Sequence, residues 1–322
     1  MKVGLKSLFV MDHFSTVLID RDTTYAFMGE AQKRGHQVYA CQLGDLHCEM
    51  GKSRVRATQV SVHRDPNAPF QVIGREALSL DDFHVIMMRK DPPYNMRYVF
   101  STYLLEGLDP GRTLVINRPQ ALRDANEKCF ILRFPDIIPE SLVTMRPEEI
   151  EAFMGRHGGR CIVKPLDGNG GIGVFLLRQD DPNLSSLIET STGFGQRYVM
   201  CQRYLPEASE GDKRIILIDG KPVGATLRVP PEGELRGNIH VGATCAKTIL
   251  TPQDMKICER LGPVLSECGI YFAGIDVIGG LLTEVNLTSP TGIHEINRLN
   301  GVCLEGQMWD WIEQRPEISA AR

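Results

Sequence analysis

The sequence has no apolar run long enough to cross a membrane. Its longest apolar stretches are short, such as residues 85–88, whereas a membrane-spanning helix needs roughly 18 apolar residues or more. Residues 1–12 contain two lysines and then an aspartate, without the apolar core and small-residue cleavage site of a secretory signal. These absences predict a cytoplasmic protein without a membrane partner.

A surplus of basic residues is missing too. The chain has 36 Lys and Arg against 40 Asp and Glu, which gives a formal net charge of -4 and a pI of about 6.1. A basic surface is what attracts nucleic acid or anionic lipid. We therefore expect no nucleic-acid partner.

The cysteines and histidines lack the spacing of a soft-metal site. The nine cysteines are scattered and odd in number, without a C-x-x-C pair, and the eight histidines show no H-E-x-x-H pattern. This usage fits a reduced cytosol better than a disulfide scaffold. The G-x-S-x-G nucleophile elbow is also missing, so covalent enzyme catalysis is not indicated. Because neither the cysteines nor the histidines have the spacing of a metal site, any metal site should use oxygen ligands.

The residues that are present have an ordinary globular composition. Of 322 residues, 42% are apolar and 24% are charged, which is enough for more than one lobe. The first ~125 residues alternate between strand and helix patterns, and this order predicts a parallel sheet. Strands are expected at residues 8–11, 38–41, 60–62, 83–88 and 114–116, and helices from Asp22 or Thr23 to Gly35 and around residues 98–105.

The rest of the chain has a different order of expected helices and strands. One helix is expected from Pro147 and a longer one from Pro252 to Gly269, kinked or interrupted at Pro263. A hairpin is predicted around the turn at residues 219–220. The other expected strands are residues 161–163, 174–177, 198–202, 215–218, 222–227, 272–277 and 282–285.

A glycine-rich stretch is the first candidate for chemistry. Residues 164–173 read Lys-Pro-Leu-Asp-Gly-Asn-Gly-Gly-Ile-Gly, and such a loop can point several backbone N–H groups at one anion. The spacing satisfies G-x-G-x-x-G, but that fingerprint must open a helix, and residues 174–177 have a strand pattern. No lysine follows the last glycine, which excludes a Walker A loop. A mobile flap over phosphates is favoured, and an ordinary hairpin turn is the alternative.

Three oxygen-bearing residues near the C-terminus form the second candidate. Glu284 and Asn286 lie two apart on one expected strand and so point to the same face. A tight turn at residues 279–280 would bring Asp276 opposite them. Two carboxylates and an amide suit Mg²⁺, which adds water and substrate phosphates. The alternative is a solvated polar face of an antiparallel pair.

Three further segments could contribute residues to a ligand-binding site. Lys128 alone has the pattern of an exposed helix lysine. Residues 229–248 are expected to form a long loop, in which Arg236 and the neighbouring Arg228 could clamp an anion; a mobile surface loop is the alternative. Residues 89–91 follow a buried strand, where ligands of open α/β sheets bind, and their charges could hold a zwitterion. A simple chain reversal at the following Pro-Pro pair is equally compatible.

Together these motifs resemble bacterial glutathione synthetases of the ATP-grasp superfamily. Single motifs occur in other ATP-grasp enzymes, but the combination, above all residues 89–93, is specific to this family. The resemblance runs in order from about Met11 to the C-terminal helix. The matching stretches are residues 89–93, 117–119, 123–128, 164–168 with 170–171, 211–214, 236–238, 274–279 and 283–286.

The resemblance implies a fold of two parts. A Rossmann-like α/β domain, residues 1–124, would precede a two-lobed ATP-grasp fold. The first lobe would span residues 125–200, with a small lid loop at 167–173. The second would span residues 201–322, with the large loop at 229–248 and the metal site.

The resemblance also implies roles for individual residues. ATP is expected at Lys128, Lys164, Asp167, Gly168, Gly170, Gly171, Gln202, Tyr204, Leu205 and Lys213, and Mg²⁺ (or Mn²⁺) at Asp276, Glu284 and Asn286. Catalytic roles fall to Arg228, Arg236 and Asn238, and substrate contacts to Arg89, Asp91, Arg214, Ser289 and Thr291.

The implied reaction joins γ-glutamylcysteine and glycine while ATP is converted to ADP and phosphate, through an acyl phosphate. The family is commonly a homo-tetramer. Two other functions are compatible with the same motifs: another ATP-grasp carboxylate–amine ligase, or a non-catalytic ATP-binding homologue.

The sequence departs from the family pattern in three places. Residues 242–244 are Gly-Ala-Thr where the large loop usually ends Gly-Gly-Arg, so one lid cation is missing. Residues 291–294 are Thr-Gly-Ile-His in place of Thr-Cys-Ile-Arg, and His13 replaces a proline.

Overall fold

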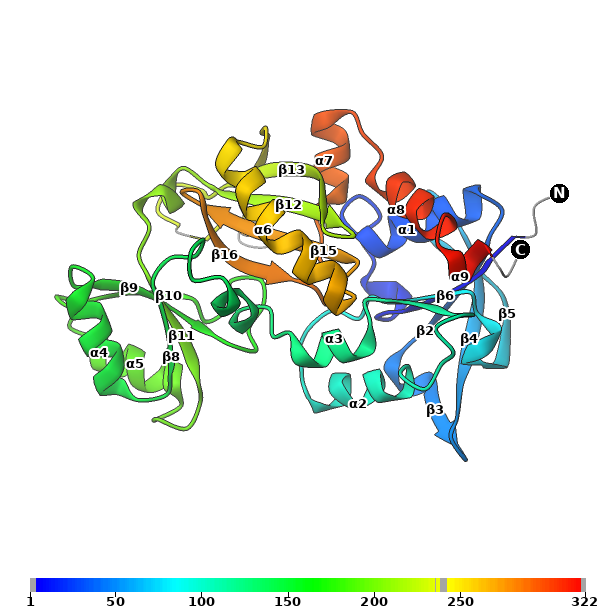
Figure 1. Ribbon diagram of the computed structural model, residues 1–322, viewed down its shortest axis with the longest axis horizontal. Helices are drawn as coiled ribbons and strands as arrows, with labels where there is room; N and C mark the ends of the chain where they lie inside the picture. Colours follow the sequence, from blue (N-terminus) through cyan, green and yellow to red (C-terminus); the bar gives the residue numbers. More distant parts are fainter. Residues whose placement is uncertain (1–3, 235, 238–241, 320–322) are drawn as a thin grey trace.

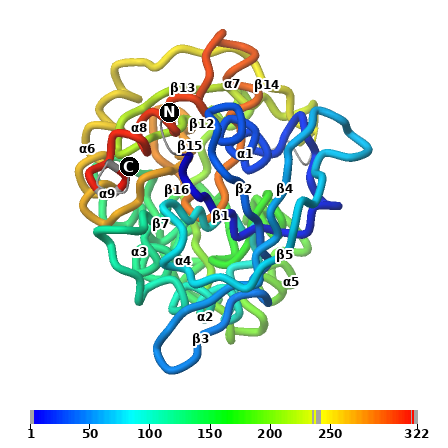
Figure 2. Tube along the Cα trace, turned by 90° about the vertical axis from the view of Figure 1, so that its right-hand side faces the viewer, coloured from blue at the N-terminus to red at the C-terminus, as the bar shows by residue number. Residues whose placement is uncertain are grey.

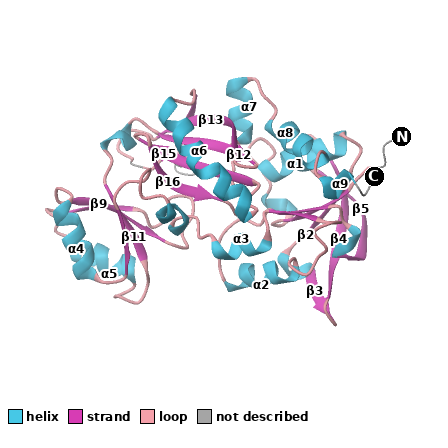
Figure 3. Cartoon of the chain, in the orientation of Figure 1, coloured by secondary structure: helices cyan, strands magenta, loops and turns pink. Residues whose placement is uncertain are grey.

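The structure, a computed structural model, describes residues 4–234, 236–237 and 242–319. These residues form three sheets that follow one another along the long axis of the molecule (Figure 1), and helices pack against them (Figure 3). No helix in this described part combines the length and apolar character that a membrane span needs. The expected α/β domain followed by two mixed lobes agrees with this architecture.

The first sheet has a parallel centre and an antiparallel flank. Strands β2, β1, β6 and β7 are parallel neighbours in that order, while β3, β4 and β5 form an antiparallel ribbon next to β2. The predicted parallel sheet is therefore confirmed for its centre, but the ribbon was missed except for one stretch of β4. The strands are β1 (Lys6–Val10), β2 (Gln37–Cys41), β3 (Leu46–Glu49), β4 (Lys52–Val62), β5 (Phe70–Ser79), β6 (Val85–Met88) and β7 (Leu114–Ile116).

Helices cover both faces of this parallel centre, which explains why the buried parts of its strands are continuous apolar runs. Leu8 and Ile86 pack on the face of α2 (Met96–Leu104) and α3 (Pro119–Asp124). Phe9 and Met87 pack on the opposite face with α1 (Thr23–Lys33), whose N-cap is Asp22 as predicted.

The second sheet is antiparallel, in the order β10-β9-β11-β8. Side-chain alternation along β9 turns Cys161 and Val163 toward α4 and α5, and turns Ile162 and Lys164 to the opposite face. The predicted lobe boundary at residue 200 falls inside β11. The elements are β8 (Ser141–Thr144), α4 (Pro147–Arg156), β9 (Arg160–Pro165), β10 (Phe175–Arg178), α5 (Leu184–Thr192) and β11 (Val199–Arg203).

The third sheet has the order β14-β13-β12-β15-β16. The predicted hairpin is confirmed: Asp219 and Gly220 both have positive φ, 47° and 73°, as a two-residue turn of this kind requires. The expectation of a structureless segment at 229–248 was wrong in part, because β14 pairs with β13 inside it. The strands are β12 (Asp212–Ile218), β13 (Lys221–Val229), β14 (Thr244–Lys247), β15 (Phe272–Ile278) and β16 (Leu281–Asn286).

Helix α6 (Pro252–Cys268) packs on the third sheet and ends at Gly269, as predicted, but it is not interrupted at Pro263. A proline inside a helix removes one backbone hydrogen bond. Here the proline is exposed, while Leu261 and Leu265 are fully buried against the sheet. Burial of this apolar face holds the helix together across the missing bond.

The C-terminal helices return to the first sheet. In α8 (Leu304–Glu313), the indole Nε1 of Trp309 donates to the backbone oxygen of Phe27, 2.9 Å away, and Asp310 pairs with Arg34 at 2.8 Å. Two shorter helices flank α8: α7 (Ile293–Asn300) and α9 (Pro316–Ser319).

One asparagine ties the first sheet to the third. At the end of β7, the Asn117 amide donates to the backbone oxygens of Phe272 (2.9 Å) and Leu287 (2.8 Å) and accepts from the Phe272 N–H at 2.9 Å. This joint fixes the ends of β15 and β16, which carry the residues described next.

Candidate functional site

The glycine-rich loop and the oxygen-bearing strands line one cavity of about 370 Å³. The structure therefore brings the glycine-rich loop and the three oxygen-bearing residues to a single cleft, as predicted. Most of the expected nucleotide and metal residues line it: Lys128, Lys164, Gly168, Gly170, Gly171, Gln202, Tyr204, Leu205, Asp276, Glu284 and Asn286.

The small loop connects β9 to β10 and does not open a helix, which confirms the rejection of a dinucleotide fingerprint. Gly170 and Gly171 have φ of 61° and 79°, a region that L side chains rarely adopt. At Gly168, an added Cβ would lie 2.5 Å from Cγ of Pro165. The glycines thus permit a tight loop whose backbone faces the cavity.

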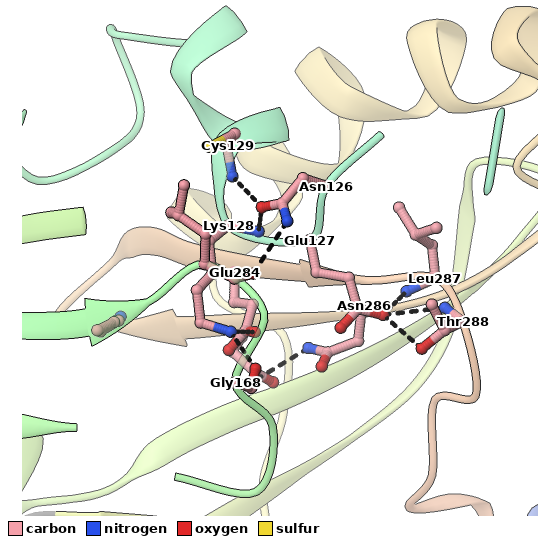
Figure 4. A network of polar contacts seen from close by, with 12 residues as sticks. Asn126, Glu127, Lys128, Cys129, Gly168, Glu284, Asn286, Leu287 and Thr288 are labelled. Atoms are coloured by element: carbon pink, nitrogen blue, oxygen red, sulfur yellow. Dashed lines mark hydrogen bonds and ion pairs between the residues drawn. The ribbon is translucent and has the colours of Figure 1, made fainter. Parts of the chain in front are cut away.

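Lys128 joins this loop to the third sheet (Figure 4). Its Nζ donates to the backbone oxygen of Gly168 at 2.6 Å and pairs with Oε1 of Glu284 at 3.0 Å. Burial lowers the pKa of Lys128, but the carboxylates of Glu284, Glu127 and Asp167 together outweigh burial and raise it overall. The lysine is a cation at the cavity wall that a phosphate could draw away from Glu284.

Lys164 reaches the same cavity from β9. Its Nζ donates to Oε1 of Gln202 at 2.6 Å, and Gln202 Nε2 donates to the hydroxyl of Ser141 at 3.0 Å. Burial lowers the pKa of Lys164. Within the described part of the chain it forms no ion pair, so a phosphate would supply the missing counter-charge.

The oxygen-bearing residues lie on paired strands. Asp276 is opposite Glu284 in the register of β15 and β16, and Asn286 Nδ2 donates to Asp276 Oδ2 at 3.1 Å. No group of three or more His, Cys, Asp and Glu in the described residues could hold a metal alone. Two carboxylates and an amide can fit Mg²⁺ only if ATP and water complete its shell.

Two buried arginines form ion pairs with the Asp276 carboxylate. Arg214 binds both of its oxygens, at 2.6 and 3.0 Å, and Arg228 binds Oδ1 at 2.9 Å. Burial would raise the pKa of Asp276, but the two guanidinium groups hold it well below its usual range. Arg228 also bonds Asp212, whose pKa burial raises to about 6. The site therefore carries internally balanced charges beside the cavity.

A second cavity of about 390 Å³ meets the first at Asn169, Gly170 and Asn286. It extends toward the carboxyl ends of β1 and β6, the edge where ligands of open α/β sheets bind. Among its lining residues are six of the expected catalytic and substrate residues: Arg89, Asp91, Arg214, Arg228, Ser289 and Thr291.

Arg89 is the most unusual residue of the second cavity. It is only 5% exposed, and its partners are uncharged: Nε donates to the Thr24 hydroxyl at 3.1 Å and Nη2 to the Pro290 backbone oxygen at 3.0 Å. It forms no ion pair within the described residues. Burial lowers the pKa of Arg89. Asp91 and Asp22 offset only part of this shift. A buried guanidinium without a directly bonded anion suits a ligand carboxylate.

Some expected residues are not brought into the cavities. Lys213 points to α6, where it pairs with Asp254 at 2.5 Å, because alternation along β12 sends it away from the face of Asp212 and Arg214. We therefore leave Lys213 out of the nucleotide site. Asp167 is exposed and lies beside a small hollow of about 20 Å³ instead. Asn238 lies outside the described residues.

Arg236 lines the first cavity and connects the two loops. Its guanidinium pairs with Glu234 through two nitrogens, at 2.9 and 2.6 Å, and Nη1 donates to the backbone oxygen of Gly171 at 3.3 Å. The large loop thus contacts the small loop directly over the cavity.

Two acidic residues of the site were missed in the sequence. Asp212 lies two positions before Arg214, so strand alternation could have placed it on the same face. Glu127 was passed over beside Lys128, and its partners, Leu287 and Thr288, lie so far along the chain that no local pattern reveals them.

Comparison with known proteins identifies the family to which this fold and these cavities belong. Residues 5–123 match the family described as "Prokaryotic glutathione synthetase, N-terminal domain", and residues 127–301 match its ATP-grasp domain. A protein named glutathione synthetase from Gloeobacter violaceus is 46% identical over 325 aligned positions, covering 99% of both chains. One from Escherichia coli strain K12 is 42% identical over 312 positions, covering 97% of this chain and 98% of its own.

Solved structures of low identity share the fold. The D-cycloserine synthetase DcsG superimposes with a TM-score of 0.64 at 13% identity, covering 96% of this chain and 100% of its own. The ATP-grasp ligase PsnB, solved with a precursor peptide and AMPPNP, gives 0.62 at 16% identity, covering 98% and 99%. By its fold, its paired cavities and its similarity over nearly the full length, this chain belongs to the prokaryotic glutathione synthetase family.

Proposed function

We propose that this chain is a glutathione synthetase that joins γ-L-glutamyl-L-cysteine to glycine and converts ATP to ADP and phosphate. The observation that carries the proposal is the sequence identity of 41 to 46% to proteins of that name over nearly the whole chain. The two joined cavities support it, because an ATP-dependent ligase needs a nucleotide site next to a site for the acid it activates.

We place ATP in the first cavity. The adenine would lie against residues 202–205, where backbone groups can read the base. Lys128, Lys164 and the N–H groups of the small loop would face the phosphates, since these cations have either one anionic partner or none. Arg236 would close the large loop over the nucleotide.

We place Mg²⁺, or Mn²⁺, at Asp276, Glu284 and Asn286. Their oxygen donors fit such an ion. Arg214 and Arg228 already satisfy Asp276, so its metal role requires one of them to turn away. Arg228 is the better candidate, because it holds a single oxygen of Asp276 whereas Arg214 holds both. When bound, the ion would neutralise charge on the transferred phosphoryl group.

The dipeptide would occupy the second cavity. Arg89 would hold its remote carboxylate, and its cysteinyl carboxylate would face Arg228 and the γ-phosphate where the cavities meet. That carboxylate attacks phosphorus to give an acyl phosphate and ADP, and the amine of glycine then displaces phosphate. Ser289 and Thr291 would lie on the amine side. The protein's part is to orient these groups and exclude water, which would hydrolyse the intermediate.

One assay tests this function. The enzyme is incubated with ATP and γ-glutamylcysteine, with and without glycine, and the products are identified by mass spectrometry. Glutathione should form only with glycine present, with one ADP per product. Formation of a different amide from a panel of amines would favour another ATP-grasp ligase, and ATP binding without any product would favour a non-catalytic homologue.

We also propose that the enzyme is cytoplasmic and a homo-oligomer, a tetramer by resemblance. Helix α2 supports association, because Met96, Phe100 and Tyr103 lie on one face and are 58%, 61% and 55% exposed. A contact between two copies of this face about a twofold axis would cover these side chains. Figure 2 shows the β3–β4 hairpin projecting on the same side of the molecule.

The variant Phe100→Glu should therefore shift the protein toward the monomer in light scattering after size exclusion. It places a carboxylate in the apolar face of α2 on each copy, and an unpaired charge buried in such a contact is destabilising. Ile73→Glu, at an apolar residue of β5 with 61% exposure, is the control and should keep the wild-type mass. An unchanged mass for Phe100→Glu would exclude α2 as the interface.

A further inference from the structure

Glu127 holds the turn that follows the last expected metal ligand. Its Oε1 accepts three hydrogen bonds, from the N–H groups of Leu287 (2.8 Å) and Thr288 (2.9 Å) and from the Thr288 hydroxyl (2.9 Å). Figure 4 shows the carboxylate reaching across to this turn. Its backbone oxygen accepts from Val285 N–H at 3.0 Å, so the residue is fixed at both ends.

The second carboxylate oxygen of Glu127 has no hydrogen-bond or ion-pair partner in the described part of the chain. The side chain lines the second cavity. Burial and the neighbouring Glu284 raise the pKa of Glu127, while the three hydrogen bonds from Leu287 and Thr288 favour its charged form. A fixed, partly buried anion with one oxygen open to a cavity is suited to binding a cation from the ligand.

The other carboxylates of this cavity are either engaged or distant from the junction. Asp12 pairs with Lys90 at 2.9 Å and accepts from the Asp91 N–H. Asp22 caps helix α1. Asp91 follows β6, near the Arg89 end of the cavity. Glu127 differs because its partners, Leu287 and Thr288, directly follow Asn286, which lines both cavities.

We propose that Glu127 binds the ammonium group of the acceptor amino acid. The proposal rests on the proposed function, in which the amine must reach a carbonyl activated at the junction of the two cavities. The open oxygen of Glu127 can hold an ammonium there, while its other oxygen keeps the carboxylate in place. The acceptor class is a small primary amine with its own negative charge, of which glycine is the smallest amino acid.

The variant Glu127→Gln tests this assignment. The amide oxygen can still accept from Leu287 and Thr288, so the turn is kept while the charge is removed. We expect KM for glycine to rise about tenfold or more, because a hydrogen bond to a charged group is lost, with KM for ATP and for γ-glutamylcysteine within about twofold of wild type. A rise of the same size in all three would mean a structural role only.

A partial reaction separates acceptor binding from the chemistry before it. Scrambling of ¹⁸O within ATP, measured with γ-glutamylcysteine and without glycine, reports reversible acyl phosphate formation. Glu127→Gln should retain this scrambling at close to the wild-type rate. Absence of scrambling and product in the wild type would overturn the proposed function itself, whereas an unchanged glycine KM in the variant would overturn only the role of Glu127.

Two more variants separate the charge of Glu127 from its structural contacts. Thr288→Val removes one donor to Glu127 but keeps the charge, so KM for glycine should change less than about threefold. Glu127→Asp keeps the charge on a shorter side chain and should raise KM for glycine less than Glu127→Gln does. The reverse order would contradict a charge-dependent role.

Discussion

Replacing Glu284 with glutamine is expected to leave the protein folded and to lower kcat at least about 100-fold, which corresponds to roughly 3 kcal/mol of transition-state stabilisation. The change removes one of the two carboxylates proposed to hold the metal. The amide can still accept a hydrogen bond from Lys128, which lies 3.0 Å from Glu284 Oε1, so the structural contact is preserved. The measurement is steady-state ADP release, with the free energy of unfolding from urea denaturation.

Glu148→Gln is the matched control for this change. Glu148 also forms an ion pair, with Arg146, but lies on helix α4 away from both cavities. Its variant should keep wild-type turnover. For Glu284→Gln, the concentration of Mg²⁺ that gives half-maximal rate should also rise. Wild-type rates at low Mg²⁺ would remove Glu284 from the metal site.

Replacing Arg89 with methionine is expected to raise KM for γ-glutamylcysteine roughly 10- to 100-fold, the loss of charge-assisted hydrogen bonds of about 1.5 to 3 kcal/mol. Stability should change little. The substitution leaves the Thr24 hydroxyl and the Pro290 oxygen without their donor, but it also removes a buried charge that forms no ion pair within the described residues. A methionine of similar length can pack between the rings of Phe27 and Phe272, which now lie near the guanidinium.

The control for Arg89→Met is Arg133→Met. Arg133 also lies over an aromatic ring, that of Phe130, at 5.1 Å from its centroid, but lies outside both cavities. It should leave KM for each substrate unchanged. If Arg89→Met changes KM for ATP as much as KM for the dipeptide, the residue supports the fold rather than the ligand.

The parts of the site that depend on local rules could be predicted. Glu284 and Asn286 are two apart on a strand, and a double-glycine turn returns the chain to Asp276, so pleat and turn geometry alone bring the three together. The Asp219-Gly220 hairpin is predictable for the same reason. The small loop could be separated from a dinucleotide fingerprint because the pattern after it is that of a strand.

The parts of the site and fold that depend on partners far along the chain could not be predicted from the sequence. Lys213 was assigned to ATP from its motif. Strand alternation separates it from Arg214, but which of the two faces the nucleotide depends on partners such as Asp254, on a helix 41 positions away. Arg89 was expected to bind substrate, but nothing local indicates that it is buried without a counter-anion. The antiparallel ribbon of β3 to β5 needed partners that only the folded sheet supplies.

The return of α8 to α1 bears on how this protein is made. Trp309 is fully buried beside Phe27, so the face of the first sheet that carries Phe9 and Met87 cannot be completed until the ribosome has released α8. A nascent chain would expose that apolar surface while the 282 positions from Phe27 to Trp309 are synthesised. Molecular chaperones, or pairing with another chain, would have the longest time to act on this face.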